Sequence, residues 1–148
     1  MSTAPHAWPE GITLNLLNAR NRGTLMEALG IEFIELADGY LRARMPVDAR
    51  THQPYGLLHG GASVALAETL GSSAGMLMAG GNAVVGLEIN ANHLRAVRHG
   101  EVIGTARPIH IGRSTQVWAI EIADQDGKPV CISRITLAVL PQPPAAGG

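Results

Sequence analysis

One nearly uncharged stretch constrains the fold of this chain more than any other. Residues 55–81, YGLLHGGASVALAETLGSSAGMLMAGG, contain a single charged side chain, Glu68. The stretch enters an apolar helix through a glycine pair, Gly60 and Gly61. Because a helix that is apolar nearly all round must be buried, we expect a curved sheet, a second subunit or both to cover it. A carboxylate in such a helix is costly unless it is partnered or used, so Glu68 is the first candidate functional residue.

The rest of the chain favours β-strands. Short turns such as Asp38-Gly39 and Asp126-Gly127 separate six extended stretches, at residues 31–36, 40–47, 83–93, 101–111, 115–123 and 129–140. Two short helices are expected before them, at residues 12–20 and 24–29. One long helix against about six antiparallel strands predicts an α+β layer arrangement. At 148 residues the chain suits one domain, residues 12–140, between flexible tails at residues 1–11 and 141–148.

Composition excludes several classes of function. A formal net charge of −1 gives no general attraction to nucleic acid or to acidic membranes. The long apolar stretch contains Glu68 and several glycines and serines, which argues against a membrane span. The only cysteine, Cys131, allows no intramolecular disulfide and is expected to be a small core residue. The histidines lack the spacing of a metal site, and the first residues do not resemble a secretion signal, so we expect a metal-free cytoplasmic protein.

The glycine pair indicates chemistry at the start of the long helix. A helix N-terminus presents free backbone N–H groups and a partial positive charge, and Gly60 and Gly61 would let a ligand oxygen approach them. Such a site can hold a carbonyl that becomes an oxyanion during acyl transfer. The nearby Gln53 and His59 could add a donor and orient the site. The alternative is that the two glycines only allow a tight turn into the helix.

The spacing of Glu68 indicates a second chain. Glu68 lies nine residues after His59, which is half a turn beyond two full turns and about 13 Å along a helix. One helix cannot direct both side chains at one carbonyl, so a shared reaction needs Glu68 from a second copy related by a two-fold axis. Ser72, four residues further, lies on the same face and could hold the carboxylate or a water. Alternatively, Glu68 is an interface carboxylate bonded to Ser72 or to a partner's amides.

The same residues carry a family resemblance. The segments QPYGLLHGGASVALAETLGS and VVGLEINANHLR resemble the hotdog-fold acyl-CoA thioesterases, in the branch of the Arthrobacter-type 4-hydroxybenzoyl-CoA thioesterase and the 1,4-dihydroxy-2-naphthoyl-CoA hydrolases. The resemblance covers about residues 12–140. It implies a long central helix wrapped by a curved antiparallel sheet, two subunits that join their sheets, and dimers that pair into tetramers.

The resemblance also implies roles for the candidate residues. Glu68 would be the catalytic carboxylate, supplied by the opposite subunit, acting as nucleophile or as base for water. Gln53 and the Gly60 amide would polarise the thioester carbonyl, and His59 would position Gln53 or the thioester. Ser72 would serve the hydrolytic water.

A CoA site is expected where basic side chains are densest. Arg95, Arg98, Arg107 and Arg113 lie close in sequence, and arginine suits phosphate recognition. The alternative is that these arginines only keep exposed strand edges soluble. The resemblance implies that CoA lies along the following residues: Leu87; His93, Leu94, Arg95, Ala96 and Val97; and Ile111, Gly112, Arg113, Ser114, Thr115 and Gln116.

The sequence therefore predicts an enzyme that hydrolyses acyl-CoA thioesters, with aromatic acyl groups favoured. The reaction needs a carbonyl polariser and a nucleophile or base, and no cofactor, since CoA is part of the substrate. Two alternatives remain open: a proofreading thioesterase that acts on aryl or acyl carrier protein, and a non-catalytic acyl-CoA-binding module on the same fold.

Overall fold

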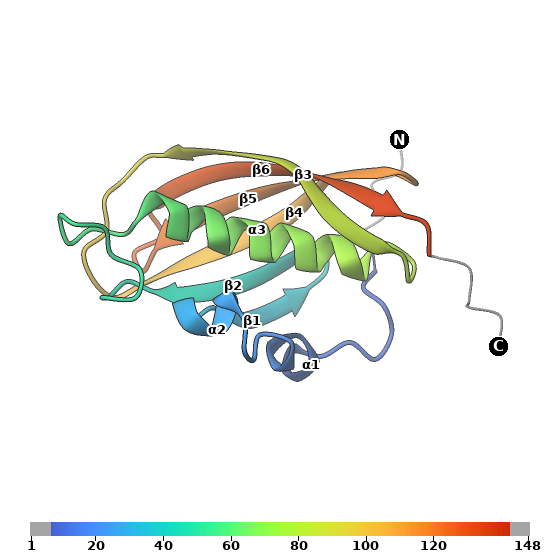
Figure 1. The fold of residues 1–148 in the computed structure, drawn as a ribbon, viewed down its shortest axis with the longest axis horizontal. Helices are drawn as coiled ribbons and strands as arrows, with labels where there is room; N and C mark the ends of the chain where they lie inside the picture. The colour runs from blue at the N-terminus through green and yellow to red at the C-terminus, as the bar shows by residue number, and fades with distance from the viewer. Residues whose placement is uncertain (1–6, 143–148) are drawn as a thin grey trace.

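The computed structural model, in which residues 7–142 are described, is one antiparallel sheet curved around one long helix (Figure 1). Two short helices, α1 (Leu14–Ala19) and α2 (Leu25–Leu29), precede the strands β1 (Glu32–Ala37) and β2 (Tyr40–Pro46). The long helix α3 (Gly60–Leu77) is followed by β3 (Ala83–His93), β4 (Glu101–Ile111), β5 (Thr115–Asp124) and β6 (Pro129–Leu140). The predicted α+β arrangement, with about six strands and short N-terminal helices, is confirmed. Within residues 7–142, no helix is long and apolar enough to cross a membrane.

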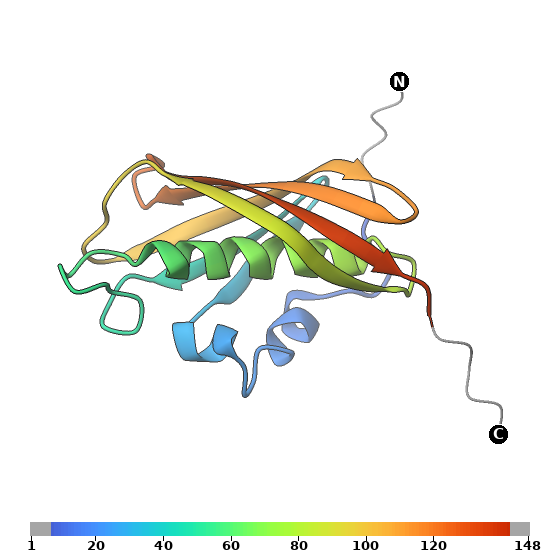
Figure 2. The ribbon, with the colours of Figure 1, turned by 45° about the horizontal axis from the view of Figure 1, so that its top comes forward.

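The sheet has the strand order β1-β2-β4-β5-β6-β3, so β3 lies at an edge although β4 follows it in the chain. The segment between His93 and Glu101 crosses from that edge to the middle of the sheet (Figures 1 and 2). In β3, the pairing with β6 shifts between Gly86 and Glu88, which leaves Leu87 in a β-bulge. Among the described residues, no strand pairs with the outer edge of β3.

Helix α3 packs its small and apolar side chains onto the inner face of the sheet. Two rows of residues spaced by four are buried: Ala62, Leu66, Leu70 and Ala74, and Ser63, Ala67, Gly71 and Gly75. A Cβ at Gly71 would overlap the Ile135 side chain, and one at Gly75 would overlap Leu137. These close approaches explain why the sequence has glycine here. The other face of α3, which includes Glu68 and Ser72, is only half-buried.

The outer face of the sheet is polar. Arg42 and Arg44 of β2 form ion pairs of 2.8 Å with Glu35 and 2.7 Å with Glu32, both on β1. Between them, Leu41, Ala43 and Met45 are completely buried beneath α3. The alternation predicted for this strand, with one buried and one wet face, is confirmed.

The packed part of the chain begins before residue 12. The Trp8 indole N–H donates a 2.7 Å hydrogen bond to the Ala37 carbonyl, and its ring stacks on Trp118 with centroids 6.2 Å apart. Most of the two predicted tails, residues 1–6 and 143–148, lies outside the described residues. Cys131 is completely buried, and this burial raises the pKa of its thiol, which confirms it as a core residue.

Candidate active site

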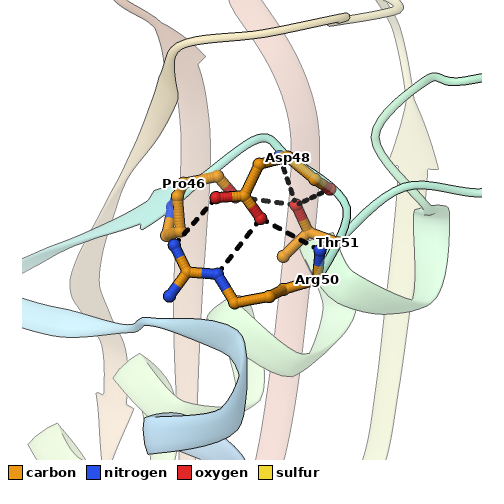
Figure 3. Close-up of polar contacts among 4 residues, drawn as sticks. All are labelled: Pro46, Asp48, Arg50 and Thr51. Atoms are coloured by element: carbon orange, nitrogen blue, oxygen red, sulfur yellow. Dashed lines mark hydrogen bonds and ion pairs between the residues drawn. The ribbon is translucent and has the colours of Figure 1, made fainter.

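The loop before α3 is held by a compact set of contacts at its start (Figure 3). The Asp48 carboxylate accepts a 2.9 Å hydrogen bond from the Arg50 backbone N–H and pairs with the Arg50 guanidinium at 2.8 Å. These contacts with Arg50 lower the pKa of Asp48 to about 2. The Thr51 hydroxyl donates to the Pro46 carbonyl at 2.7 Å and accepts from the Asp48 N–H at 3.2 Å. The loop therefore leaves β2 in a defined direction.

Backbone hydrogen bonds then fold the loop back onto the start of α3. The His59 N–H donates to the Thr51 carbonyl, and the Gln53 N–H donates to the Leu57 carbonyl, both at 2.8 Å. The Leu58 N–H donates to the Val97 carbonyl at 2.8 Å, which ties this loop to the segment that follows β3. These bonds bring the region of Gln53, the start of α3 and the end of β3 together.

A cavity of about 380 Å³ lies where these three segments meet. The residues that line it are Gln53, Leu57, Leu58, Gly60, Ser63, His93, Leu94, Arg95, Ala96 and Val130. A Cβ at Gly60 would lie only 2.8 Å from His93 Nε2, so the imidazole lies directly against the helix start. A side chain at residue 60 would collide with His93, so glycine is needed here to let the imidazole approach the helix. A glycine that only allowed a tight turn would not need a neighbour this close.

The cavity presents neutral hydrogen-bond donors. The Gln53 side-chain oxygen Oε1 accepts from the Tyr55 backbone N–H, which orients the amide and leaves the Nε2 hydrogens available to a ligand. The Gly60 N–H is among the first amides of α3 and has no acceptor within residues 7–142. An Nε2 group and a backbone N–H on the wall of one cavity can polarise a carbonyl oxygen and stabilise negative charge on it.

His59 is placed differently from the other predicted residues. Its Nδ1 accepts a 2.7 Å hydrogen bond from the Gly61 N–H and caps α3, so that in the neutral ring Nε2 carries the hydrogen. Its side chain lines a neighbouring cleft with Gly61 and Ala65, and no hydrogen bond joins it to Gln53 in the described part of the chain. In one chain, His59 and His93 therefore line different hollows at the helix start.

Glu68 lies outside the cavity that Gln53 and Gly60 line. It is two turns further along α3, on the half-buried face, and its Oε1 would lie 2.7 Å from a Cβ at Gly86. Gly86 stands at the bulge of β3, so the carboxylate lies against the unpaired edge of the sheet. Its carboxylate makes no hydrogen bond or ion pair with any other described residue. A single chain therefore does not bring Glu68 to the cavity.

Ser72 borders a separate groove. This groove has a volume of about 350 Å³ and lies between α1, α3 and the start of β3. Ser72, Ser73 and Met76 line it from α3, and Leu17, Phe33 and Val84 line it from the other elements. No hydrogen bond joins Ser72 to Glu68 among residues 7–142. The groove is thus positioned one turn beyond Glu68, on the same side of α3.

The residues predicted to bind CoA fall at two ends of the sheet. His93, Leu94, Arg95 and Ala96 line the cavity, and Val97 supplies the carbonyl that holds Leu58. Residues 111–116 form the turn between β4 and β5, closed by a 2.8 Å hydrogen bond from the Gly112 N–H to the Thr115 carbonyl. The first group precedes β4 in the chain and the second lies at its end, so most of the length of this strand, about 35 Å for 11 residues, lies between them. Arg95 and Arg113 of one chain therefore do not meet.

Two further predicted residues are placed by the sheet. Leu87 is the bulged residue of β3, and its side chain is 61% exposed. Gln116 is completely buried: its Nε2 donates to the Gly75 carbonyl at 3.2 Å, and its Oε1 accepts from the Trp118 indole at 2.8 Å. Both polar atoms of this side chain are used inside the core, where they hold α3 on the sheet, so only the backbone of Gln116 remains available for the predicted role.

Sequence reasoning missed some residues of the site. Ser63 lines the cavity one turn after Gly60, and that spacing could have identified it. Val130 joins the wall from β6, and no local pattern indicates this contact. A further hollow of about 390 Å³ lies on the outer face of the sheet beside Arg42 and Arg107, and none of the predicted catalytic residues lines it.

Comparisons with known proteins show the family of the chain. The family model described as the thioesterase superfamily matches residues 55–131, which include α3 and every residue that lines the cavity except Gln53. The proofreading thioesterase EntH of Cronobacter turicensis is 56% identical over 134 residues, covering 90% of this chain and 98% of the relative. The 1,4-dihydroxy-2-naphthoyl-CoA hydrolase of Escherichia coli K12 is 54% identical, with the same coverage.

A solved structure shares the whole fold. The crystal structure of a thioesterase from Haemophilus influenzae superposes with a TM-score of 0.90 at 48% sequence identity, covering 95% of this chain and 99% of that one. The likeness therefore includes the short N-terminal helices as well as the sheet and α3.

Proposed function

Since the chain belongs to the thioesterase superfamily and is an acyl-CoA thioesterase, we propose that its substrates are aromatic acyl-CoA thioesters, which it hydrolyses to the free acid and CoA. The observation that carries this proposal is the convergence of Gln53, the Gly60 N–H and His93 on one cavity. An aromatic acyl group is supported by the apolar groove beyond Glu68 and by the aromatic substrate in the name of the Escherichia coli relative.

The thioester carbonyl lies at the start of α3 in this mechanism. The Gly60 N–H and Gln53 Nε2 donate to its oxygen and stabilise the oxyanion that forms on attack. His93, against Gly60, orients the pantetheine arm, and Arg95 at the same cavity pairs with a phosphate of CoA. His59 holds the Gly61 N–H and so fixes the first turn of the helix.

The attacking group comes from a second copy of the chain. Glu68 acts as nucleophile on the carbonyl carbon or as base for water, and Ser72 on the same face serves the water. Hydrolysis forms a C–O bond between the acyl carbon and the oxygen of water and breaks the C–S bond, and a proton from the water goes to the leaving thiolate of CoA. Where Glu68 is the nucleophile, the C–S bond breaks as an anhydride forms on Glu68, and water then cleaves this anhydride. This assignment is supported by the separation of Glu68 from the cavity within one chain.

The free edge of β3 is the surface on which two copies join. The outer edge of this 11-residue strand pairs with no other strand among the described residues, and the strand exposes 46% of Val85 and 61% of Leu87. An unprotected edge of this length is a template for strand pairing. Antiparallel pairing of two β3 strands places Glu68, which lies against β3, near the partner's cavity, and the same symmetry moves Arg113 toward the partner's Arg95. Two such dimers then form a tetramer.

A carrier-protein substrate is the second candidate. It is favoured by the name of the Cronobacter turicensis relative, the proofreading thioesterase EntH. Acyl-CoA and a loaded carrier protein both present a thioester on a phosphopantetheine arm, so the same cavity would serve either.

A thiol-release assay tests the proposed function. Benzoyl-, hydroxybenzoyl- and hydroxynaphthoyl-CoA are compared with hexanoyl- and octanoyl-CoA, and with an aryl-loaded carrier protein. We expect the aryl-CoA esters to give the highest kcat/KM. A higher value for alkyl esters would contradict the aromatic assignment, and a higher value for the carrier protein would establish the second candidate. If no substrate of the set releases thiol, the proposed hydrolysis of these thioesters is wrong.

A further inference from the structure

Two buried side-chain atoms within residues 7–142 have no hydrogen-bond partner, the Ser133 hydroxyl and Oδ1 of Asn21, and of these two residues Asn21 lines the groove beside Ser72. Asn21, between α1 and α2, is 6% exposed, and its side-chain oxygen Oδ1 makes no hydrogen bond with any described residue. The side-chain Nδ2 donates to the Ile31 carbonyl at 3.1 Å, which fixes the orientation of the amide. Buried acceptors are nearly always paired, so an orphan oxygen indicates a missing donor.

Asn21 lines the groove beyond Glu68. Ser72 and Met76 line the same groove from α3, four and eight residues after Glu68. Residues at this spacing share one helix face, so the groove continues from the carboxylate over about 6 to 12 Å of the helix axis. Under the proposed function, an acyl group whose carbonyl carbon is attacked by Glu68 of this chain would extend into this groove, toward Asn21.

The groove fits a ring with a polar substituent. Its volume of about 350 Å³ exceeds the roughly 150 Å³ of an apolar cavity that binds benzene. Leu17, Phe33 and Met76 supply apolar walls, whereas Arg20 and Asn21 supply a donor and an acceptor beside each other in the sequence. A hydroxyl group both donates and accepts, so it can use both residues.

Building on the proposed function, we infer that Asn21 is a specificity-determining residue that accepts a hydrogen bond from a ring hydroxyl of the acyl group. An aromatic acyl group with a hydroxyl remote from the thioester would satisfy Oδ1, whereas a methyl group at the same place would leave it unpaired. The unpaired buried acceptor opposes binding of the ester that carries the methyl group, so the site favours the ester that carries the hydroxyl.

Substrate pairs test the inference directly. The 3- and 4-hydroxybenzoyl-CoA esters are each compared with the methylbenzoyl-CoA ester of the same substitution, which is similar in size but cannot donate. We expect the wild-type enzyme to favour the hydroxyl ester of at least one pair in kcat/KM. In Asn21→Leu, which has a side chain of similar shape, this preference is expected to fall by about three- to tenfold, the range for one neutral hydrogen bond.

Asn18→Ala is the matched control. Asn18 bonds to both backbone groups of Phe33, at 2.9 and 2.8 Å, and thus ties α1 to β1 much as Asn21 ties its loop to Ile31. Asn18 does not line the groove. General loosening of this region lowers the rates for both esters of a pair together, so the control is expected to keep the wild-type preference.

The outcomes separate the inference from the proposed function. If the esters are hydrolysed and Asn21→Leu keeps the wild-type preference in both pairs, or if Asn18→Ala loses it equally, the inference alone is overturned. If the wild type shows no preference in either pair, a water molecule satisfies Oδ1 and the inference is also overturned. If the wild type hydrolyses none of the esters, the proposed function fails and the inference fails with it.

Discussion

The N-terminal end of α3 and the middle of the same helix carry complementary chemistry. At the N-terminal end, Gln53 and the Gly60 N–H line a cavity as neutral hydrogen-bond donors. In the middle, Glu68 presents a carboxylate on the half-buried face, beside the free edge of β3. Attack on a thioester needs both the hydrogen-bond donors and the carboxylate, yet the rigid helix α3 holds them apart.

The difference teaches that the complete site belongs to two chains. The sheet covers the rows of α3 that contain Leu66 and Gly71, and it leaves the Glu68 face open toward the β3 edge. A second chain on that edge would both pair β3 and receive the carboxylate. The same face of the helix would then contribute to catalysis and to association.

Loss of the carboxylate is expected to have the largest effect. Glu68→Gln keeps the shape of the side chain but removes the nucleophile or base, so kcat/KM should fall by about 10²- to 10⁴-fold. Steady-state thiol release from the best aryl-CoA ester measures this. The control is Glu121→Gln, because Glu121 lies exposed on β5 between the buried Ile120 and Ile122 and faces away from α3. A Glu68→Gln enzyme within threefold of wild type would remove Glu68 from the chemistry.

Loss of the cavity donor is expected to follow. Gln53→Ala removes the amide whose oxygen is held by the Tyr55 N–H, and with it one donor to the oxyanion. Removal of one such donor typically lowers kcat by about 10²- to 10³-fold. The expected pattern is a fall in kcat with little change in KM, because the bond strengthens in the transition state. A change confined to KM would instead assign Gln53 to binding.

A steric test examines the closeness of Gly60 and His93. In Gly60→Ala, the new Cβ would lie 2.8 Å from His93 Nε2, so the helix start or the imidazole must move. We expect kcat/KM to fall by about tenfold, in line with the usual cost of overpacking. Adding His93→Ala makes room for the methyl group, and the double variant should lose less than the two single variants predict together. Additive losses would show that the two residues do not touch in solution.

The smallest effect is expected at the loop that delivers Gln53. Arg50 lowers the pKa of Asp48 from 3.8 to about 2, so this contact stabilises the fold above about pH 4, and the stabilisation is lost as the pH falls toward 2. Asp48→Asn should therefore have a slightly lower Tm at pH 7, and the difference from wild type should disappear near pH 2. Thermal unfolding followed by circular dichroism measures this, with Asp126→Asn in the exposed β5–β6 turn as control. A difference that persists unchanged at pH 2 would exclude the ion pair as its cause.

Much of this arrangement is predictable from the sequence because it depends on local patterns. Local patterns predict the elements: the long apolar helix with its single charge, the alternation along residues 40–47 and the glycine turns. The spacing of His59 and Glu68 along the helix already indicates that these two side chains lie far apart. The edge position of β3 is not predictable this way, because strand order depends on contacts between distant segments.

The details of the site that were missed have the same cause. The contact of His93 with Gly60 joins the end of β3 to the start of α3 across the fold. Gln116 belongs to the predicted CoA segment, but the alternation of β5 turns its side chain into the core. Asn21 carries no sequence signal, because its orphan oxygen is visible only once the loop is packed.

A dimer with one defect in each chain tests the shared site most directly. Glu68→Gln and Gln53→Ala chains with different affinity tags are co-expressed, and the mixed dimer is isolated by purification on both tags and then by size-exclusion chromatography, which separates it from a tetramer of two unmixed dimers. If Glu68 acts on the partner's cavity, one of the two sites is intact, and the mixed dimer should have about half the wild-type activity. If both residues act within one chain, each site carries a defect, and the mixed dimer would be as inactive as the two parent variants.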